Sequence, residues 1–327
     1  MTSWCVTNAG RSVKNLFSAA AYGGLGWSPR QGSLRDELGS IWGPCGVTDE
    51  WSSLRAVLLH RPGAELEVAD PAESQMIEPV DVRLAQRQHD ALADAFQSAG
   101  VRVHYVDPDE DVPPNLMFVA DLMFMTAEGA ILARPASTVR AGEERFIARR
   151  LAELGIPILL SVHGEGTFEG ADAAWIDPET VLLATGLRTN ARGAAQVAGL
   201  LEMIGVEVIR VGLPYGTMHL MGQLRLVDRD LAVGWPGRVP HAAVEALRAR
   251  GFKVLFLPEG DESRRGMALN VVTLGPRSVL MPGGNPVARS LYEEAGISCQ
   301  TVDVSELVKA AGGIGCLTGV LERASSR

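Results

Sequence analysis

The feature that most constrains the fold is an order of elements that recurs about every 50 residues from residue 50 onward. Each unit is predicted to contain a strand, a second strand, a helix and a third strand, with Gly and Pro residues in the turns. The four elements fall at 116–125, 130–134, 143–154 and 156–162 in the second unit, at 167–176, 181–184, 190–204 and 206–211 in the third, at 219–227, 231–234, 241–250 and 253–257 in the fourth, and at 269–274, 279–281, 286–295 and 298–302 in the fifth.

The first unit is incomplete, because it offers strands at 54–59 and 101–106 and a helix at 82–98 but lacks one early strand. The apolar run 316–321 near the C-terminus could supply it, which would close a ring of five units. We expect such closure to leave no free sheet edge and to gather functional residues at equivalent strand ends around a central channel. The alternative is an ordinary doubly wound α/β sheet, but the pair of strands before each helix favours the repeat.

The chain is predicted to have an irregular N-terminal extension over residues 1–48 and a single domain over residues 49–327. Residues 1–34 are basic and contain no acidic residue, as in some targeting segments. The apolar stretch 16–21 is short, however, and it runs into a Tyr-Gly-Gly sequence. A tail is therefore expected over this segment.

Composition narrows the class of partner. A formal net charge of -9 disfavours a nucleic-acid or anionic membrane surface and fits a small cationic substrate. No apolar stretch approaches the roughly 20 residues of a membrane-spanning helix. The four cysteines show neither metal-ligand spacing nor a dense disulfide framework. We therefore expect a cytoplasmic protein without a metal or other cofactor.

Four short segments occupy matching places in successive units: NLMFVAD (115–121), FEGAD (168–172), MHLMG (218–222) and GGIGC (312–316). Together they supply Asp121, Glu169, His219 and Cys316. Cleaving a guanidinium needs such a set, because its resonance-stabilised carbon resists attack by water. A thiolate can form a covalent adduct, and an imidazole can protonate the departing amine and then activate water.

Each of these residues also has a structural interpretation. Cys316 could be a small buried hydrophobic residue, and His219 could be a core histidine with satisfied hydrogen bonds. The glycines at 312 and 313 favour a functional cysteine, because they let the backbone turn sharply at a crowded site. Asp121 and Glu169 lie in predicted apolar strands, where an unpaired carboxylate costs several kcal/mol. A buried carboxylate of this kind usually has a cationic partner.

The ordered segments NLMFVAD, ILARPA, FEGAD, GLRTN, MHLMG, LNVV and GGIGC resemble the pentein superfamily over roughly residues 50–323. This superfamily includes arginine deiminases, dimethylarginine dimethylaminohydrolases and amidinotransferases. The resemblance implies a five-bladed α/β propeller around a pseudo-fivefold axis. It also implies a cysteine-dependent hydrolase that cleaves a guanidino C–N bond through a covalent thiouronium-type intermediate.

Carried over by position, the resemblance makes Cys316 the nucleophile, His219 the general acid/base and Glu169 the residue that orients the imidazole. The implied substrate is a small guanidino compound. The implied substrate-binding residues are Asp121 for the guanidinium, Arg188 and Arg134 for the α-carboxylate, and Asn115 and Met221.

Two positions depart from the family pattern. Met221 stands where deiminases and amidinotransferases usually carry an Asp, and a thioether favours an N-substituted guanidine, as in the dimethylarginine hydrolases. Ala120 stands where these families often carry Arg or Glu, which leaves the pocket less charged. The GGIGC segment, in contrast, is closer to the deiminase and amidinotransferase form.

A dimethylargininase-like hydrolase is favoured, because no acceptor site for amidino transfer is evident. Amidinotransferase and arginine deiminase or dihydrolase activity remain alternatives. An alternative of another class is a non-catalytic binding or assembly protein, since the superfamily includes a ribosome anti-association factor. The presence of Cys316, His219 and Glu169 together counts against it. The sequence leaves open whether the chain forms a homodimer.

Overall fold

The computed structural model describes residues 18–67 and 69–324, and the chain divides into two units, Met1–Glu37 and Leu38–Arg327. The described part of the first unit contains η2 (Ala20–Tyr22) and α1 (Leu34–Glu37). Residues 1–17 of the expected tail lie outside the described residues. Residues 38–48, which the sequence assigned to the extension, belong to the larger unit. There Gly46 N donates to Leu321 O at 2.9 Å and Val47 N to Thr126 O at 3.1 Å.

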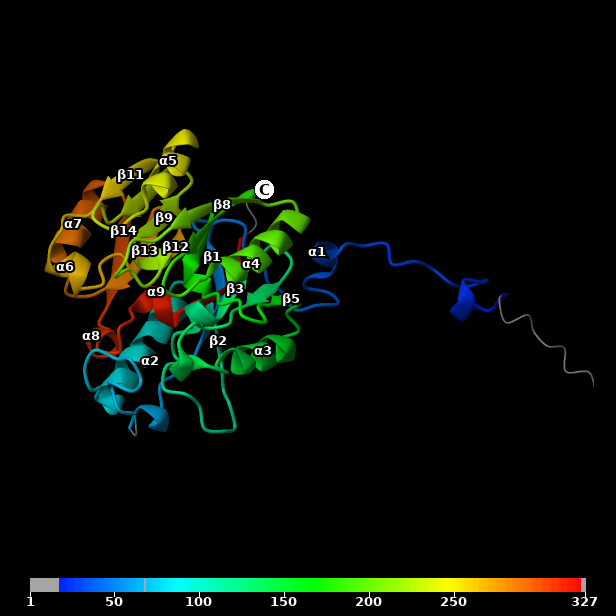
Figure 1. Ribbon diagram of the computed structural model, residues 1–327, viewed down its shortest axis with the longest axis horizontal. Helices are drawn as coiled ribbons and strands as arrows, with labels where there is room; N and C mark the ends of the chain where they lie inside the picture. The colour runs from blue at the N-terminus through cyan, green and yellow to red at the C-terminus, as the bar shows by residue number, and fades with distance from the viewer. Residues whose placement is uncertain (1–17, 68, 325–327) are drawn as a thin grey trace, which may run out of the picture. The chain divides into compact units, whose positions relative to one another are not determined.

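The larger unit has an α/β fold that contains five separate three-stranded sheets (Figure 1). Each sheet combines one antiparallel pair of strands with one parallel pair. The sheets comprise β3 (Met123–Met125), β4 (Ala130–Leu132) and β5 (Ile158–Ser161); β6 (Ala173–Asp177), β7 (Thr180–Thr185) and β8 (Glu207–Gly212); β9 (Leu224–Asp228), β10 (Leu231–Gly234) and β11 (Lys253–Phe256); β12 (Val272–Gly275), β13 (Ser278–Pro282) and β14 (Ser298–Val302); and β15 (Gly319–Arg323), β1 (Leu54–Leu59) and β2 (Arg102–Tyr105).

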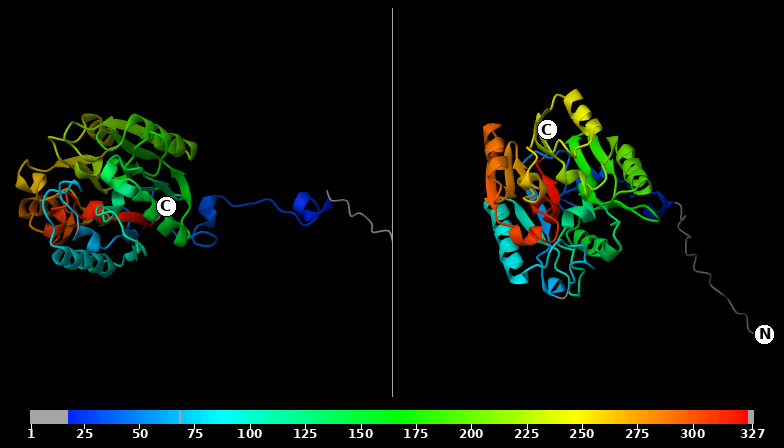
Figure 2. Two further views of the ribbon diagram at one scale, coloured as in Figure 1. Left: turned by 60° about the horizontal axis from the view of Figure 1, so that its bottom comes forward. Right: turned by 60° about the vertical axis from the view of Figure 1, so that its left-hand side comes forward.

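A long helix connects the two parallel strands of each sheet, as the repeat predicted. These helices lie around the outside of the sheets in Figures 1 and 2. The connecting helices are α2 (Val82–Ser98), α3 (Glu144–Glu153), α4 (Ala191–Met203), α5 (His241–Ala249) and α7 (Pro286–Glu294). The shorter elements of the unit are η3 (Ala64–Leu66), η4 (Val119–Leu122), η5 (Thr138–Arg140), η6 (Gly170–Asp172), η7 (Leu220–Gly222), α6 (Asp261–Arg264), α8 (Ser305–Val308) and α9 (Ile314–Leu317).

Helix α2 illustrates why these segments form helices and which of their faces packs against the core. Its buried residues Ala85, Leu92 and Phe96 recur at helical spacing and face the core. Asp81 caps the first turn by accepting a hydrogen bond from Leu84 N at 3.0 Å. Burial of a Leu or Phe side chain contributes about 1.5–3 kcal/mol, so the apolar stripe fixes the helix against its sheet.

The two ends of the larger unit pair with each other. Strand β15 is antiparallel to β1, with Val320 opposite Val57 and Gly319 opposite Leu58. The prediction that the C-terminal apolar run supplies the missing strand is therefore confirmed. The predicted absence of free sheet edges is wrong, because each third strand pairs only with the second strand of its own unit and the described strands form no closed sheet.

A second correction concerns the first strand of each unit. The predicted strands at 116–125, 167–176 and 219–227 begin as the 3-10 turns η4, η6 and η7, and only their later residues form β3, β6 and β9. Cys316 likewise lies in the single turn of α9, before β15 starts. The candidate functional residues are therefore on tight turns or directly before them. The turns η4, η6 and α9 are wholly buried, whereas in η7 only Leu220 is buried.

The expectations about membrane-spanning helices and about disulfide bonds can be compared with the structure. No helix among the described residues is long and apolar enough to cross a membrane. Within the described residues, Cys45, Cys299 and Cys316 are unpaired. Cys5 lies outside the described residues.

Buried His89 on α2 predicts a pH dependence of stability. Neither of its ring nitrogens has a hydrogen-bond partner among the described residues, and burial, with the nearby His60, lowers its pKa to about 3. The unfolded chain takes up this proton below about pH 6.5 whereas the folded chain stays neutral. The free energy of unfolding should therefore fall as the pH drops from about 6.5 towards 3, by up to about 1.4 kcal/mol per pH unit from this group.

Urea unfolding of the wild type and of His89→Leu between pH 7 and 4 measures this contribution. The variant should lose part of the slope, whereas His241→Leu, which changes an exposed histidine of α5, should keep it. Equal slopes for the wild type and His89→Leu would contradict the assignment.

Candidate active site

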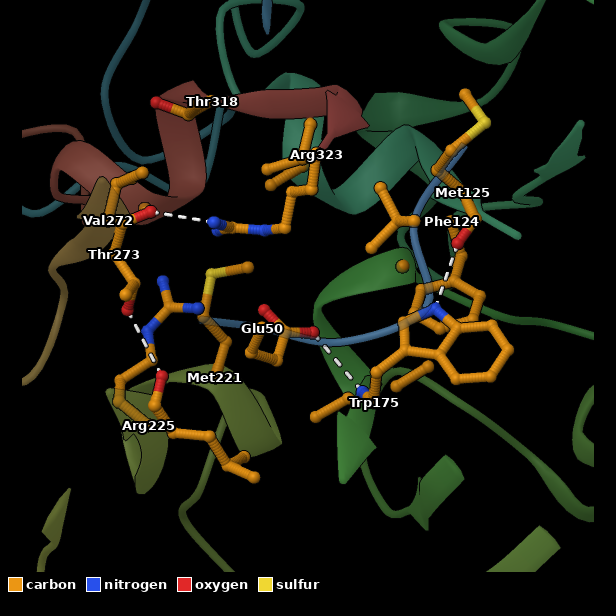
Figure 3. Close-up of a pocket in the computed structure, with 18 of the residues that line it drawn as sticks. Glu50, Phe124, Met125, Trp175, Met221, Arg225, Val272, Thr273, Thr318 and Arg323 are labelled. Carbon is orange, nitrogen blue, oxygen red and sulfur yellow. Dashed lines mark hydrogen bonds between the residues drawn. The ribbon is translucent and has the colours of Figure 1, made fainter. Parts of the chain in front are cut away.

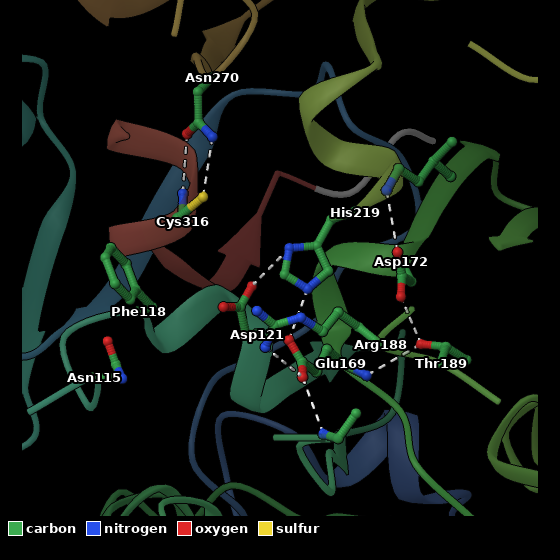
Figure 4. Close-up of polar contacts among 12 residues, drawn as sticks. Asn115, Phe118, Asp121, Glu169, Asp172, Arg188, Thr189, His219, Asn270 and Cys316 are labelled. Carbon is green, nitrogen blue, oxygen red and sulfur yellow. Dashed lines mark hydrogen bonds and ion pairs between the residues drawn. The ribbon is translucent and has the colours of Figure 1, made fainter. Parts of the chain in front are cut away.

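Four tight turns bring the predicted chemical groups together (Figure 4). Asp121 lies in η4, Glu169 and His219 are the residues that precede η6 and η7, and Cys316 lies in α9. Each turn comes directly before the first strand of its sheet, namely β3, β6, β9 and β15. The repeat therefore places one functional group from each of four units at an equivalent position.

Gly170 explains how two of these turns can approach so closely. A side chain at this position would overlap the backbone carbonyl groups of Ala120 and Met123. Only glycine leaves room for η6 to lie directly against η4. The carboxylates of Asp121 and Glu169 therefore reach the same imidazole.

His219 lies between two carboxylates and is only 4% exposed. Its Nε2 is 2.7 Å from Glu169 Oε2, and its Nδ1 is 3.7 Å from Asp121 Oδ1. Burial alone would lower the pKa of His219, but the charge of Asp121 and the hydrogen bond to Glu169 raise it above its ordinary value. The resting site therefore holds an imidazolium that can act as a general acid.

Glu169 is held by further donors. Its Oε1 accepts a hydrogen bond from Ala136 N at 3.1 Å and lies 3.5 Å from Arg188 Nη1. Although burial opposes ionisation, the hydrogen bond from His219 and the nearby arginine charges lower the pKa of Glu169. This contact between Glu169 and His219 is compatible with the orienting role that the family resemblance implies for Glu169.

The side-chain amide of Asn270 forms hydrogen bonds with both the thiol and the backbone N–H of Cys316. Its Nδ2 donates to Cys316 Sγ at 3.0 Å, and its Oδ1 accepts from Cys316 N at 3.1 Å. Burial and the charge of Asp121 raise the pKa of the Cys316 thiol, so the resting group is a neutral thiol. The sequence analysis did not assign Asn270 a role, although it lies in the LNVV segment before β12, at the fifth equivalent position.

Asp121 has one oxygen in a hydrogen bond and a second, Oδ1, that lies 3.7 Å from His219 Nδ1 without forming one. Arg140 Nη1 donates to its Oδ2 at 2.6 Å, and Arg140 Nε donates to Glu143 Oε2 at 2.9 Å. The other oxygen, Oδ1, is buried without a hydrogen-bond partner among the described residues. A guanidinium N–H could bind there, with Arg140 holding the carboxylate in place. Arg140 was also missed, although a cationic partner for a buried carboxylate was expected.

Asp172 supports the turn that carries the imidazole. Its Oδ1 accepts from Leu220 N at 3.1 Å, and its Oδ2 accepts from Thr189 Oγ1 at 2.7 Å. Since Leu220 follows His219 in the chain, this carboxylate fixes the backbone of η7 rather than the reacting groups. The second acid of FEGAD is therefore a positioning residue.

Cys316 borders two cavities. The first contains the Asp121 carboxylate and two arginines, and the second contains the imidazole. The first is lined by residues that include Asn115, Phe118, Asp121, Arg140, Arg188 and Cys316. The second encloses about 440 Å³ and is lined by residues that include His219, Met221, Asn270 and Cys316. A substrate carbon at the thiol would thus have an anion on one side and a proton donor on the other.

Two predicted substrate-binding residues have structural partners. Asn115 borders the first cavity, and its Nδ2 donates to Ser74 O at 2.8 Å. Arg134 donates to Gly166 O at 3.1 Å and borders neither cavity. Of the two arginines predicted to bind the carboxylate, the structure therefore brings Arg188 to Cys316 and leaves Arg134 outside.

Asp121, Glu169 and His219 also form a group whose ligand atoms lie within 4.8 Å of one another, close enough to share a metal ion. The group already contains a cation, because Arg140 binds Asp121 and the imidazole is protonated. Repulsion from these charges disfavours a divalent ion. The geometry favours an acid/base pair over a metal centre.

The comparisons with known proteins agree with this geometry. The family model for eukaryotic N,N dimethylarginine dimethylhydrolases matches residues 73–320. The N(G),N(G)-dimethylarginine dimethylaminohydrolase of Streptomyces coelicolor is 30% identical over 241 residues, which are 74% of this chain and 87% of that protein. The corresponding protein of Pseudomonas aeruginosa is 28% identical over 253 residues, 77% of this chain and 94% of that protein.

The same fold occurs in a solved structure. The Pseudomonas aeruginosa enzyme, as a cysteine-to-serine mutant complexed with citrulline, has a TM-score of 0.69 at 24% identity and covers 83% of this chain and 100% of that one. This match shows the fold, and the family model and the sequence relatives show the family. The chain belongs to the dimethylarginine dimethylaminohydrolase family of hydrolases, which confirms the predicted pentein superfamily.

Proposed function

We propose that this chain hydrolyses a C–N bond of an N-substituted, arginine-derived guanidine through a covalent adduct on Cys316. The observation that carries the proposal is that Cys316 borders both the cavity of Asp121, whose Oδ1 lacks a hydrogen bond among the described residues, and the cavity of His219. Two relatives are named N(G),N(G)-dimethylarginine dimethylaminohydrolase, which makes dimethylarginine the first substrate to test.

The reaction begins when Asp121 accepts a guanidinium N–H. The substrate cation offsets the charge of Asp121, which otherwise raises the pKa of the Cys316 thiol, and so favours loss of the thiol proton to solvent water. The sulfur then attacks the guanidinium carbon, and the substituted amine leaves with the proton of His219. This step gives a thiouronium adduct and a neutral imidazole.

Hydrolysis of the adduct uses the same residues in reverse. The neutral His219 takes a proton from water, and the resulting hydroxide attacks the adduct carbon. The C–S bond breaks, the sulfur takes the proton of the new hydroxyl group and becomes the resting thiol again, and a ureido product forms while His219 is again protonated. Glu169 keeps the imidazole aligned during both proton transfers.

The remaining predicted site residues receive roles within this proposal. Arg188 is the donor for the substrate carboxylate, since it borders the cavity of Asp121 and is only partly exposed. Asn115 borders the same cavity and positions the segment at Ser74. Arg134 stays a prediction, because its contact is with the Gly166 carbonyl.

Met221 should select the guanidine substituent, because it borders the cavity that contains His219 and Cys316. A free guanidinium NH2 facing the thioether loses water without gaining an acceptor, at a cost of about 1–3 kcal/mol, whereas a methyl group loses nothing. Met221→Asp should therefore raise kcat/KM for arginine relative to dimethylarginine by about 5-fold or more. Met203→Asp, an exposed site on α4, should leave the ratio unchanged.

One assay tests the function as a whole. The protein is incubated with arginine, monomethylarginine or dimethylarginine, with and without glycine or ornithine, and the products are identified by mass spectrometry. Formation of citrulline and an alkylamine supports the proposal. Amidino transfer to the added amine would replace it with a transferase, ammonia release from arginine alone with a deiminase or dihydrolase, and no turnover with a binding protein.

The proposal extends to the arrangement of the fold and its setting. The five sheets are taken as the blades of an α/β propeller around a pseudo-fivefold axis, supported by their common strand order and by the pairing of β1 with β15. A cytoplasmic location is supported by the unpaired Cys45, Cys299 and Cys316. A homodimer stays untested until the oligomeric state is measured.

A further inference from the structure

A cavity separate from Cys316 and His219 lies among the first strands of the sheets (Figure 3). It encloses about 70 Å³. Its lining includes Glu50, which precedes β1, Arg225 on β9 and Arg323 on β15. Three charged side chains from distant parts of the sequence therefore meet at one small cavity.

The two arginines are incompletely paired. Arg323 is 6% exposed, and its Nη1 donates to Ser52 O at 2.7 Å and Thr273 O at 2.9 Å. Its Nε is buried without a partner among the described residues, as are Nε and Nη2 of Arg225. Buried guanidinium N–H groups normally have acceptors, because leaving them unsatisfied is costly.

The one acidic residue of the lining does not pair with either arginine. Glu50 Oε1 accepts from Trp175 N at 3.2 Å, and among the described residues Glu50 has no ion pair within 4.0 Å of Arg225 or Arg323. The lining itself holds two guanidinium groups and one carboxylate. A further buried carboxylate, Asp49, also acts on Arg323, but its Oδ1 already accepts hydrogen bonds from the backbone N–H groups of Trp51 and Ser52. Burial lowers the pKa of both arginines, which is the response of a charge that lacks full compensation.

We infer that this cavity binds one small monovalent anion, a halide or a planar oxyanion such as formate or bicarbonate. One negative charge would balance the lining, and the unpaired N–H groups of Arg225 and Arg323 would donate to it. The small volume of the cavity, about 70 Å³, favours an anion of few atoms over a larger ligand. Planar oxyanions suit the forked geometry of guanidinium.

The cavity is separate from the catalytic residues, but it lies next to the turn that carries Cys316. A side chain at Gly315 would overlap Nη2 of Arg225, so this arginine packs directly beneath the turn that carries Cys316. Neither Cys316 nor His219 lines the cavity. An anion held by Arg225 would thus stabilise the fold behind the active site, and Met221 borders both this cavity and that of Cys316.

The test measures the thermal midpoint of the full chain in sodium bromide or sodium formate at constant ionic strength, with sodium gluconate as the anion too large to enter. Bromide and formate should raise the midpoint by a few degrees with a saturable dependence. Bromide-soaked crystals should show an anomalous peak within hydrogen-bond distance of both Arg225 and Arg323. Arg225→Met should lose both effects, and Arg229→Met, an exposed arginine next to β9, should keep them.

Glu50→Gln should strengthen anion binding rather than weaken it. This variant stays informative if Arg225→Met fails to fold. Removing the carboxylate raises the net charge of the lining, so the apparent dissociation constant for bromide should fall by about tenfold. The proposal is overturned if bromide and formate act no differently from gluconate. It is also overturned if bromide binds only at the surface, or if Glu50→Gln weakens the response.

Discussion

Replacing Cys316 by Ser should reduce kcat/KM by at least about a thousandfold while leaving the folded structure intact. The hydroxyl is a much weaker nucleophile than a thiolate towards a guanidinium carbon. Folding should be preserved because Asn270 can donate to a serine Oγ as it does to Sγ, and its bond to the backbone N of residue 316 is unaffected. Steady-state kinetics and the midpoint of thermal unfolding measure the two effects.

Cys299→Ser is the matched control, because Cys299 is a half-buried cysteine on β14 that does not border the cavities of Cys316. It should retain activity. Intact-mass spectra of wild type quenched during turnover should show an adduct that the Cys316→Ser protein lacks. Activity of the Cys316→Ser protein within tenfold of wild type would remove this residue from the mechanism.

The thiol also separates an enzyme from a non-catalytic member of the superfamily. The resting thiol has a raised pKa, and a cation bound at Asp121 should lower it. A haloacetamidine carries such a cation, so it should alkylate Cys316 near neutral pH much faster than the neutral haloacetamide does. Equal rates for the two reagents would indicate that Asp121 does not activate the thiol.

Much of the fold was predictable because each unit must bury its apolar strands and helix in the same way. The first unit lacked one strand, and the apolar residues after Cys316 were the segment left to fill the gap, as the pairing of Val57 with Val320 confirms. The 3-10 turns could not be predicted. Residues 119–122 and 170–172 are wholly buried, and an apolar run of that length has the same pattern in a strand as in a tight turn.

Some residues of the candidate site could likewise be found from the sequence, and others could not. The four chemical groups were found because they recur at one position of the repeat. Asn270 and Arg140 were missed because their partners are 46 and 19 residues away in the chain, and sequence spacing alone does not show that these side chains meet. The ILARPA segment pointed to Arg134 as a donor to the substrate carboxylate, and it gave no sign that Arg140, six residues on, binds Asp121.

His219→Ala should lower kcat by about 10²–10⁴-fold, the usual contribution of a general acid/base. The loss comes from both half-reactions, since the amine must leave without a proton and water must attack without a base. If amine departure is less impaired than hydrolysis, the variant should accumulate the covalent adduct on Cys316, visible by intact mass. A fully active variant would contradict the assignment.

Glu169→Gln tests the same assignment through pH. In the wild type, the charge of Asp121 and the hydrogen bond to Glu169 raise the pKa of His219, so kcat should fall only as the pH rises through that raised value. The amide removes one negative charge beside Nε2 and therefore lowers the imidazole pKa. The alkaline limb of the kcat profile should move to lower pH by about one unit or more, because the acid is then lost earlier. A purely structural Glu169 would lower kcat equally at all pH values, so an unmoved limb would show that the carboxylate does not control the proton on His219.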